Sequence, residues 1–134
     1  MQKIENWLNL NADIGLLALR IFIGLRLIYG VVDNIFSWEK MLEFAGFLKI
    51  NGFPLPIFSA VLSVYAQFLC AILILVGYKA RFAAAILAFN FIVAMIMVHL
   101  KDSIEVMTPA LAMLFISITL LFTGAGRWAI EKKI

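Results

Sequence analysis

Residues 13–34 read DIGLLALRIFIGLRLIYGVVDN, and this stretch is apolar enough to cross a bilayer although it contains Arg20 and Arg26. A transmembrane helix needs about 20 mostly apolar residues to cross about 30 Å of hydrocarbon. An arginine at bilayer depth keeps its charge, at a cost that different estimates put between about 2.5 and more than about 10 kcal/mol. Each of these arginines therefore needs a group that solvates it, and other parts of the chain must supply that group.

The composition is that of an integral membrane protein. The chain has 134 residues, of which 65% are hydrophobic and 14% are charged, whereas soluble domains carry about 25% charged residues. Three more apolar runs follow the first one, at about 57–76, 82–100 and 106–123. The four runs together predict an all-α, integral membrane four-helix bundle in which residues 1–134 form a single transmembrane domain.

The connection between the first two spans has the pattern of an amphipathic helix over about residues 37–50. Its apolar residues gather on one side of such a helix: Trp38, Met41, Leu42, Ala45 and Leu48. Its charged residues lie largely elsewhere: Glu39, Lys40, Glu43 and Lys49. We therefore expect an amphipathic interfacial helix in the first outer loop, which lies on the outer bilayer surface or caps the bundle.

Lysine and arginine residues predict the orientation of the bundle. The segments on the side of the termini carry six of them: Lys3, Lys79, Arg81, Arg127, Lys132 and Lys133. The opposite side carries three: Lys40, Lys49 and Lys101. Because cytoplasmic loops are enriched in these residues, both termini are expected in the cytoplasm. The net charge of +3 then indicates contact with anionic membrane lipids and requires no nucleic-acid partner.

The sequence lacks the motifs of a soluble-type active site. Cys70 is its one cysteine, so an internal disulfide or a CxxC redox pair cannot form. It contains no His/Cys cluster with metal-ligand spacing, no glycine-rich phosphate loop and no nucleophile elbow. We therefore expect no metal and no built-in cofactor, and any electron transfer would need a redox partner protein.

Polar side chains from different spans are predicted to lie at a similar depth. At about 1.5 Å per helical residue, Arg26, Gln67 and Asn90 lie about 12 to 18 Å below the outer edge of the hydrocarbon core. This agreement predicts a buried polar cluster. Glutamine and asparagine also serve as plain interhelical hydrogen-bonding groups, worth about 0.6 kcal/mol on average, and would then fix helix packing without any ligand.

The two arginines of the first span are predicted to have different roles. They lie about 240° apart on an ideal helix, so they cannot share one narrow face. Arg20 is close enough to the cytoplasmic interface to snorkel, which favours a structural role. Arg26 shares its stripe with Tyr29 and Asp33. It either faces a ligand or is a structural residue paired with Asp33 or with helix-end carbonyl groups.

His99 ends the third span at the outer interface. Nine residues turn an ideal helix through about 180°, so His99 is expected to face away from Asn90. It is either solvated or handles protons near a ligand headgroup. The candidate ligand-binding residues are Arg26, Tyr29, Asp33, Gln67, Asn90 and His99.

Several motifs occur in a familiar order: Arg20, GFPLP at 52–56, GYKAR at 77–81, His99 and GAGR at 124–127. In this respect the chain resembles, over about residues 15 to 130, the DoxX-like family of small four-helix bacterial membrane proteins. That family is named after a small subunit associated with a thiosulfate:quinone oxidoreductase, and relatives are linked to quinone and thiol stress. The resemblance implies a role near quinones in a bacterial inner (plasma) membrane. Many relatives carry a glutamate where this chain has Gln67, so a proton route through that acid is not expected here.

Two classes of function follow from these observations. In the first, a redox-linked subunit binds a quinone or a similar small lipophilic molecule in an intramembrane polar pocket, where Arg26 with Gln67 or Asn90 holds a carbonyl oxygen. The alternative is a non-catalytic accessory or assembly membrane protein whose polar cluster is structural. Stripes of small residues permit a homo-oligomer. A transporter is less favoured, because the sequence shows no internal repeat or broken helix pair.

Overall fold

The computed structural model describes residues 1–99 and 102–130, which contain helices and turns and no strand. The elements are α1 (Gln2–Leu10), α2 (Ala12–Phe36), α3 (Trp38–Ile50), α4 (Pro56–Val76), α5 (Ala80–Ala94), a π-helical turn (Met95–His99) and α6 (Ile104–Thr123). Within the described residues, four segments are long and apolar enough to cross a membrane: Ala12–Phe36, Pro56–Val76, Ala80–Val98 and Ile104–Thr123. The predicted all-α fold with four membrane-spanning helices is confirmed.

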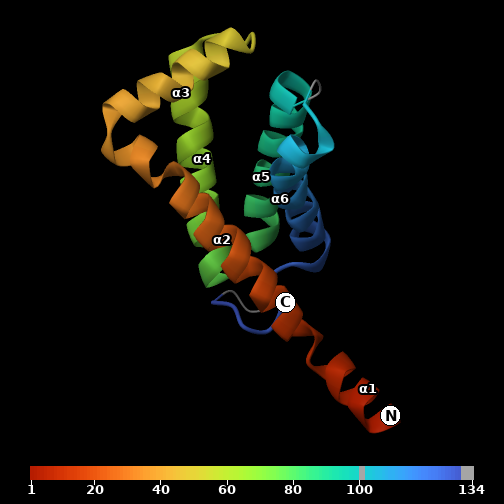
Figure 1. Ribbon diagram of the computed structural model, residues 1–134. Helices are drawn as coiled ribbons and strands as arrows, with labels where there is room; N and C mark the ends of the chain where they lie inside the picture. Colours follow the sequence, from red (N-terminus) through yellow and green to blue (C-terminus); the bar gives the residue numbers. More distant parts are fainter. Residues whose placement is uncertain (100–101, 131–134) are drawn as a thin grey trace.

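The spanning helices form two pairs. Helix α2 packs along α4 and α5 packs along α6, while contacts between α4 and α5 join the pairs, and α2 meets α6 over a short stretch. Figure 1 shows the pairs close together near the N-terminal half of α2 and diverging towards the other end. We call the first the closed end, where residues 74–81 and 120–130 lie. The other is the open end, where α2 ends and α6 begins.

Helix α3 covers one pair only. Its side chains Met41, Ala45 and Leu48 are buried in an apolar cluster with residues of α2 and α4. In the described part of the chain, α3 contacts neither α5 nor α6. The expected amphipathic helix therefore lies against α2 and α4 and does not cap the whole bundle. Trp38, expected on the apolar face, is 58% exposed, which suits a tryptophan at a membrane interface.

The pair of α2 and α4 depends on a glycine. A Cβ atom built at Gly24 would lie 2.3 Å from Cγ of Leu75, closer than any stable contact. At Gly15, on the same helix, a Cβ atom would meet nothing within 4 Å. Small residues let transmembrane helices approach closely, and Gly24 serves this purpose here.

We expect Gly24→Ala to destabilise the protein by about 1 to 3 kcal/mol, because the added methyl group forces Leu75 or the helices to move. Gly15→Ala adds the same methyl group where there is space, and alanine is the better helix former. Its unfolding temperature in mild detergent should equal or exceed that of the wild type. Equal unfolding temperatures for the two variants would show that the close approach at Gly24 does not support the fold.

The fourth spanning helix begins earlier than predicted. The sequence predicted a start at about residue 106, but α6 begins at Ile104 and Pro109 lies inside the helix. Ser103 caps this start, because its side chain accepts a hydrogen bond from the backbone N–H of Val106. Pro109 has no N–H to donate, so the carbonyl group of Glu105 lacks its usual helical donor at this position.

The third spanning segment is not one regular helix. Helix α5 ends at Ala94 and continues as a π-helical turn to His99. The prediction that His99 faces away from Asn90 assumed a regular α-helix between these two residues. That assumption is wrong, because π-helical winding changes the angle between successive side chains. The side chain of His99, a predicted site residue, lies outside the described part of the structure.

Arg20 fastens the closed end. Its guanidinium donates hydrogen bonds to four backbone carbonyl groups: those of Ile74 and Leu75, both at 2.9 Å, of Ala125 at 3.1 Å, and of Trp128. The side chain is 1% exposed, so it does not snorkel to the interface as the sequence suggested. The structural role expected for Arg20 thus has a different physical basis. The last carbonyl groups of a helix lack intrahelical donors, and Arg20 supplies donors to those of α4.

Further contacts hold residues 124–130 against the rest of the bundle. The carboxylate of Asp13 accepts a hydrogen bond from the backbone N–H of Arg127 at 3.0 Å and lies 3.5 Å from its Nε. The N–H of Ile130 donates to the carbonyl of Val76 at 2.9 Å. Arg81 donates to the carbonyl of Phe122 at 3.0 Å, near the end of α6. The closed end is therefore fixed by side chains and backbone from distant parts of the sequence.

Candidate functional site

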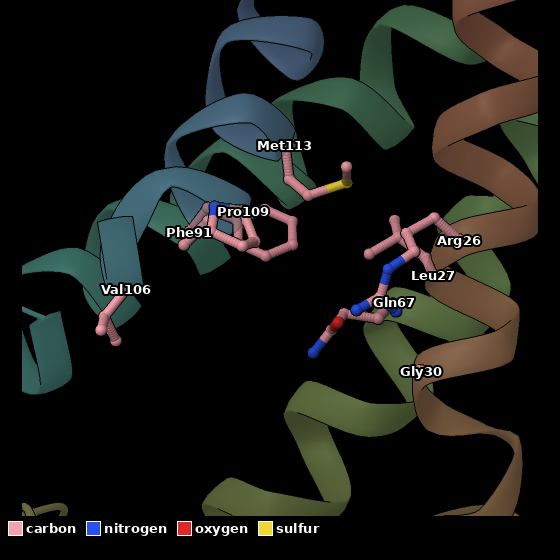
Figure 2. Close-up of a pocket in the computed structure, with 9 residues that line it drawn as sticks. Arg26, Leu27, Gly30, Gln67, Phe91, Val106, Pro109 and Met113 are labelled. Atoms are coloured by element: carbon pink, nitrogen blue, oxygen red, sulfur yellow. The ribbon is translucent and has the colours of Figure 1, made fainter. Parts of the chain in front are cut away.

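A pocket with a volume of about 240 Å³ lies between the two helix pairs. Residues of all four spanning helices line it: Arg26, Leu27, Gly30, Gln67, Phe91, Val106, Pro109, Ala110 and Met113. In Figure 2, Arg26 and Gln67 project from α2 and α4 into the same space, across from Phe91, Pro109 and Met113. The pocket thus has a polar side on the first helix pair and an apolar side on the second.

Among the described residues, Arg26 has no hydrogen-bond or ion-pair partner for its charge. Within residues 1–99 and 102–130 its guanidinium forms no hydrogen bond and no ion pair, and it lies 5.9 Å from the ring centroid of Tyr29. An arginine over an aromatic ring is stabilised weakly when exposed, by about 0.5 to 1 kcal/mol. This is small against the cost of a charge at bilayer depth.

Gly30 leaves room for the Arg26 guanidinium. A Cβ atom at Gly30 would lie 3.0 Å from Nη1 of Arg26, which is tighter than an ordinary contact. The absence of a side chain there lets the guanidinium lie beside the backbone of α2 while it lines the pocket. Arg26 can therefore offer its N–H donors to a molecule in the pocket.

Gln67 is fixed by a chain of hydrogen bonds that crosses from α4 to α5. Its Nε2 donates to Oγ of Ser63 at 3.0 Å, and Oγ of Ser63 donates to Oδ1 of Asn90 at 2.8 Å. Ser63 has one hydroxyl proton, which it donates to Asn90. Its oxygen can therefore only accept from Gln67. The result is an oriented amide next to the pocket, held through a serine and an asparagine.

The predicted site residues are placed unequally by the structure. Arg26 and Gln67 line the pocket, whereas Tyr29, Asp33 and Asn90 do not. Tyr29 is 78% exposed beside Arg26, and Asn90 acts through Ser63. Asp33 is exposed and is not ion-paired with Arg26 among the described residues. The pairing of Arg26 with Asp33, which the sequence left open as one alternative, is therefore not observed among the described residues.

Sequence reasoning missed one polar residue and most of the apolar wall. Ser63 lies one helical turn from Gln67, and this spacing, together with the shared depth of Gln67 and Asn90, was the available signal. No comparable signal marks Phe91, Pro109 or Met113, because apolar residues in a spanning helix serve equally well to face lipid. They become a pocket wall only through the way the helix pairs diverge.

The two arginines of α2 differ in whether the protein itself satisfies their hydrogen-bond donors. All three guanidinium nitrogens of Arg20 donate to backbone carbonyls, whereas Arg26 is exposed and lines a pocket with an amide beside it. A guanidinium in this position can bind an oxygen that carries a lone pair or a negative charge. The apolar wall suits a ring or another flat hydrophobic group.

The sequence was also compared with known proteins. The sequence model of the DoxX family matches residues 15–100 of this chain, which is more than half of its length. The match includes Arg20, Arg26, Gln67 and Asn90, and it ends before the start of α6. No curated protein and no solved structure matched the chain. The chain belongs to the DoxX family, a relationship that the motifs between Arg20 and His99 had already indicated.

Proposed function

We propose that this membrane protein binds the ring headgroup of a quinone, or of a similar small lipophilic molecule, in the pocket between its helix pairs. The single observation that carries the proposal is Arg26, whose guanidinium lines the pocket without a hydrogen bond or ion pair among the described residues. A charge at this depth needs solvation. A ligand oxygen supplies it, and water supplies it when the pocket holds no ligand.

The size of the pocket suits a ring headgroup, without the tail of an isoprenoid quinone. Its volume is about 240 Å³, whereas a cavity of about 150 Å³ accommodates benzene. A substituted six-membered ring therefore fits, and an attached tail would extend between the helix pairs into lipid. The apolar side chains Phe91, Pro109 and Met113 are suited to contact the faces and edges of such a ring.

Arg26 also suits a ligand that gains electrons. Reduction of a quinone places negative charge on its oxygens, and a fixed guanidinium in a site of low dielectric constant stabilises that charge. The electrons come from a redox partner protein in this proposal, because the chain offers side chains that bind and orient the ring and none that carries electrons. The protein is then a quinone-binding subunit of a bacterial inner-membrane redox system, with both termini in the cytoplasm.

A non-catalytic accessory or assembly role is the second candidate, and one observation favours it. The hydrogen-bond chain from Gln67 through Ser63 to Asn90 joins α4 to α5, as a structural polar cluster would. This role explains the amides without a ligand. It leaves Arg26 unexplained, and for that reason we favour the binding function.

The direct test is native mass spectrometry with organic extraction of the protein purified in mild detergent. Ala110 lines the pocket and is 9% exposed, so Ala110→Phe places a ring inside the pocket while Arg26 stays unchanged. Ala85→Phe adds the same ring on an exposed face of α5 and serves as the control. We expect a lipophilic ring compound bound to the wild type and to Ala85→Phe, and at least about tenfold less bound to Ala110→Phe.

Two outcomes would contradict the binding function. If Ala110→Phe and Ala85→Phe retain equal amounts of the bound compound, the compound lies outside this pocket. If the wild type carries no small molecule but co-purifies with a protein, and added duroquinone does not bind either, the accessory role is favoured.

A further inference from the structure

The hydrogen-bond chain behind the pocket has a direction, and this direction fixes which atom of Gln67 faces a ligand. The Gln67 Nε2 donates to Ser63, which donates to Asn90. Because the amide nitrogen is turned to Ser63, the amide oxygen is left to face the pocket. In the view of Figure 2 the Gln67 oxygen lies on the side of the Arg26 guanidinium, and the nitrogen points away from it.

The opposite direction of the chain is disfavoured by the charge of Arg26. In that arrangement Asn90 would donate to Ser63, Ser63 would donate to the Gln67 oxygen, and the Gln67 amide N–H groups would face the guanidinium. Both groups are then donors, so their partial positive charges repel each other. With the observed direction the carbonyl dipole of Gln67 points at the cation, which is the favourable arrangement. Arg26 and Ser63 thus act together on the same amide.

The pocket therefore presents one strong donor and one acceptor side by side. A hydroxyl group satisfies both of them with a single oxygen, which accepts from Arg26 and donates its proton to the Gln67 oxygen. A quinone carbonyl accepts from Arg26 equally well, but it has no proton for Gln67 and brings its lone pairs towards that oxygen. Gln67 is partly buried, and its oxygen is costly to leave without a donor once a ligand displaces water from the pocket.

From this geometry we infer that the pocket selects the reduced, hydroxyl-bearing form of its ring ligand, and that Ser63 and Asn90 set this selectivity by orienting Gln67. The inference rests on the proposed binding function and adds the redox state of the ligand to it. Ser63 and Asn90 are positioning residues here, since neither lines the pocket.

The test compares duroquinone with durohydroquinone, which have the same ring and methyl groups and differ by the two hydroxyl protons. Binding is measured anaerobically by calorimetry on the detergent-purified protein. We expect wild type to bind durohydroquinone about tenfold more tightly than duroquinone, because one unpaired acceptor costs about that factor in affinity. For a two-electron couple, this ratio raises the midpoint potential of the bound ring by about 30 mV.

Variants at Ser63 separate orientation from simple structural support. Ser63→Ala removes one of the two groups that orient the Gln67 amide and leaves Arg26 as the other, so the ratio of the two affinities should fall clearly below tenfold, while duroquinone still binds. Ser63→Thr keeps the hydroxyl group and should keep the tenfold ratio. Asn90→Ala removes the acceptor for Ser63 and should reduce the ratio as Ser63→Ala does, which gives a second measurement if either variant folds poorly.

Each outcome decides a specific claim. If wild type binds both rings equally, or binds duroquinone more tightly, the selectivity is wrong while the binding function stands. If Ser63→Ala keeps the tenfold ratio, Ser63 does not set the selectivity. If wild type binds neither ring and carries no endogenous one, both the inference and the proposed function fail.

Discussion

Replacing Arg20 by glutamine is expected to lower the free energy of unfolding by about 3 kcal/mol or more. Arg20 satisfies four backbone carbonyl groups, two at the end of α4 and two in residues 125–128. A glutamine side chain is shorter and has two N–H donors, so at least two of these carbonyls lose their partner. Buried polar groups without a partner cost about 1 to 3 kcal/mol each.

The same substitution should also release residues 124–130 from the closed end. In the wild type these residues are held by Arg20, by Asp13 and by the carbonyl of Val76. Loss of the first of these contacts should make the bond after Arg127 more susceptible to trypsin. Thermal unfolding in mild detergent gives the loss of stability, and limited proteolysis gives the local release. An unfolding temperature equal to that of wild type would show that the carbonyl groups find other donors.

Replacing Arg26 by glutamine should have the opposite pattern, with little effect on the fold and a large effect on the ligand. We expect the affinity for duroquinone to fall by about a hundredfold, since loss of a charged donor in a desolvated site costs about 2 kcal/mol or more in binding free energy. The unfolding temperature of the ligand-free variant should equal or exceed that of wild type, because the variant loses only the weak contact of Arg26 with the Tyr29 ring and a costly charge is removed from the membrane interior.

Arg26→Lys is the matched control for the charge. A lysine ammonium keeps the positive charge but lacks the planar fork of donors. The affinity of Arg26→Lys for duroquinone should lie between those of wild type and Arg26→Gln. If Arg26→Gln binds duroquinone as wild type does, the guanidinium does not contact the ring. If the same variant unfolds, Arg26 belongs to the architecture of the bundle in the way that Arg20 does.

Spanning helices could be predicted from the sequence because bilayer thickness sets their length. Every backbone group inside hydrocarbon must be satisfied, so an apolar run of suitable length has helix as its natural conformation. The depth argument also placed Arg26 and Gln67 together, because an α-helix rises by a fixed amount per residue. Both residues line one pocket in the structure.

The partners of Arg20 could not be predicted in this way. They are carbonyl groups of the backbone, which every residue possesses, and two of them lie in residues 125–128, beyond the end of α6. A sequence pattern gives no indication of which carbonyl meets which guanidinium. The π-helical turn at Met95–His99 has no sequence signature either, so the angle between Asn90 and His99 was predicted from regular winding that the segment does not have.

The sequence also could not predict which helices α3 packs against. Its apolar face predicted burial, and Met41, Ala45 and Leu48 are indeed buried. The pattern did not specify which helices would cover that face. Both neighbours proved to be helices adjacent in the chain, α2 and α4, and this leaves the diverging ends of the two pairs uncovered by α3.

We propose that Arg20 stabilises the fold and that Arg26 binds a ring ligand. Thermal unfolding of wild type, Arg20→Gln and Arg26→Gln, each with and without saturating duroquinone, tests both halves in one measurement. A ligand at a hundred times its dissociation constant stabilises the folded state by about 2.7 kcal/mol. At that same ligand concentration we predict this increase in wild type, an increase of only about 0.4 kcal/mol in Arg26→Gln from an unchanged or higher starting point, and a lower starting point in Arg20→Gln. An equal response of wild type and Arg26→Gln to duroquinone, or an equal loss of stability in the two variants, would contradict the account.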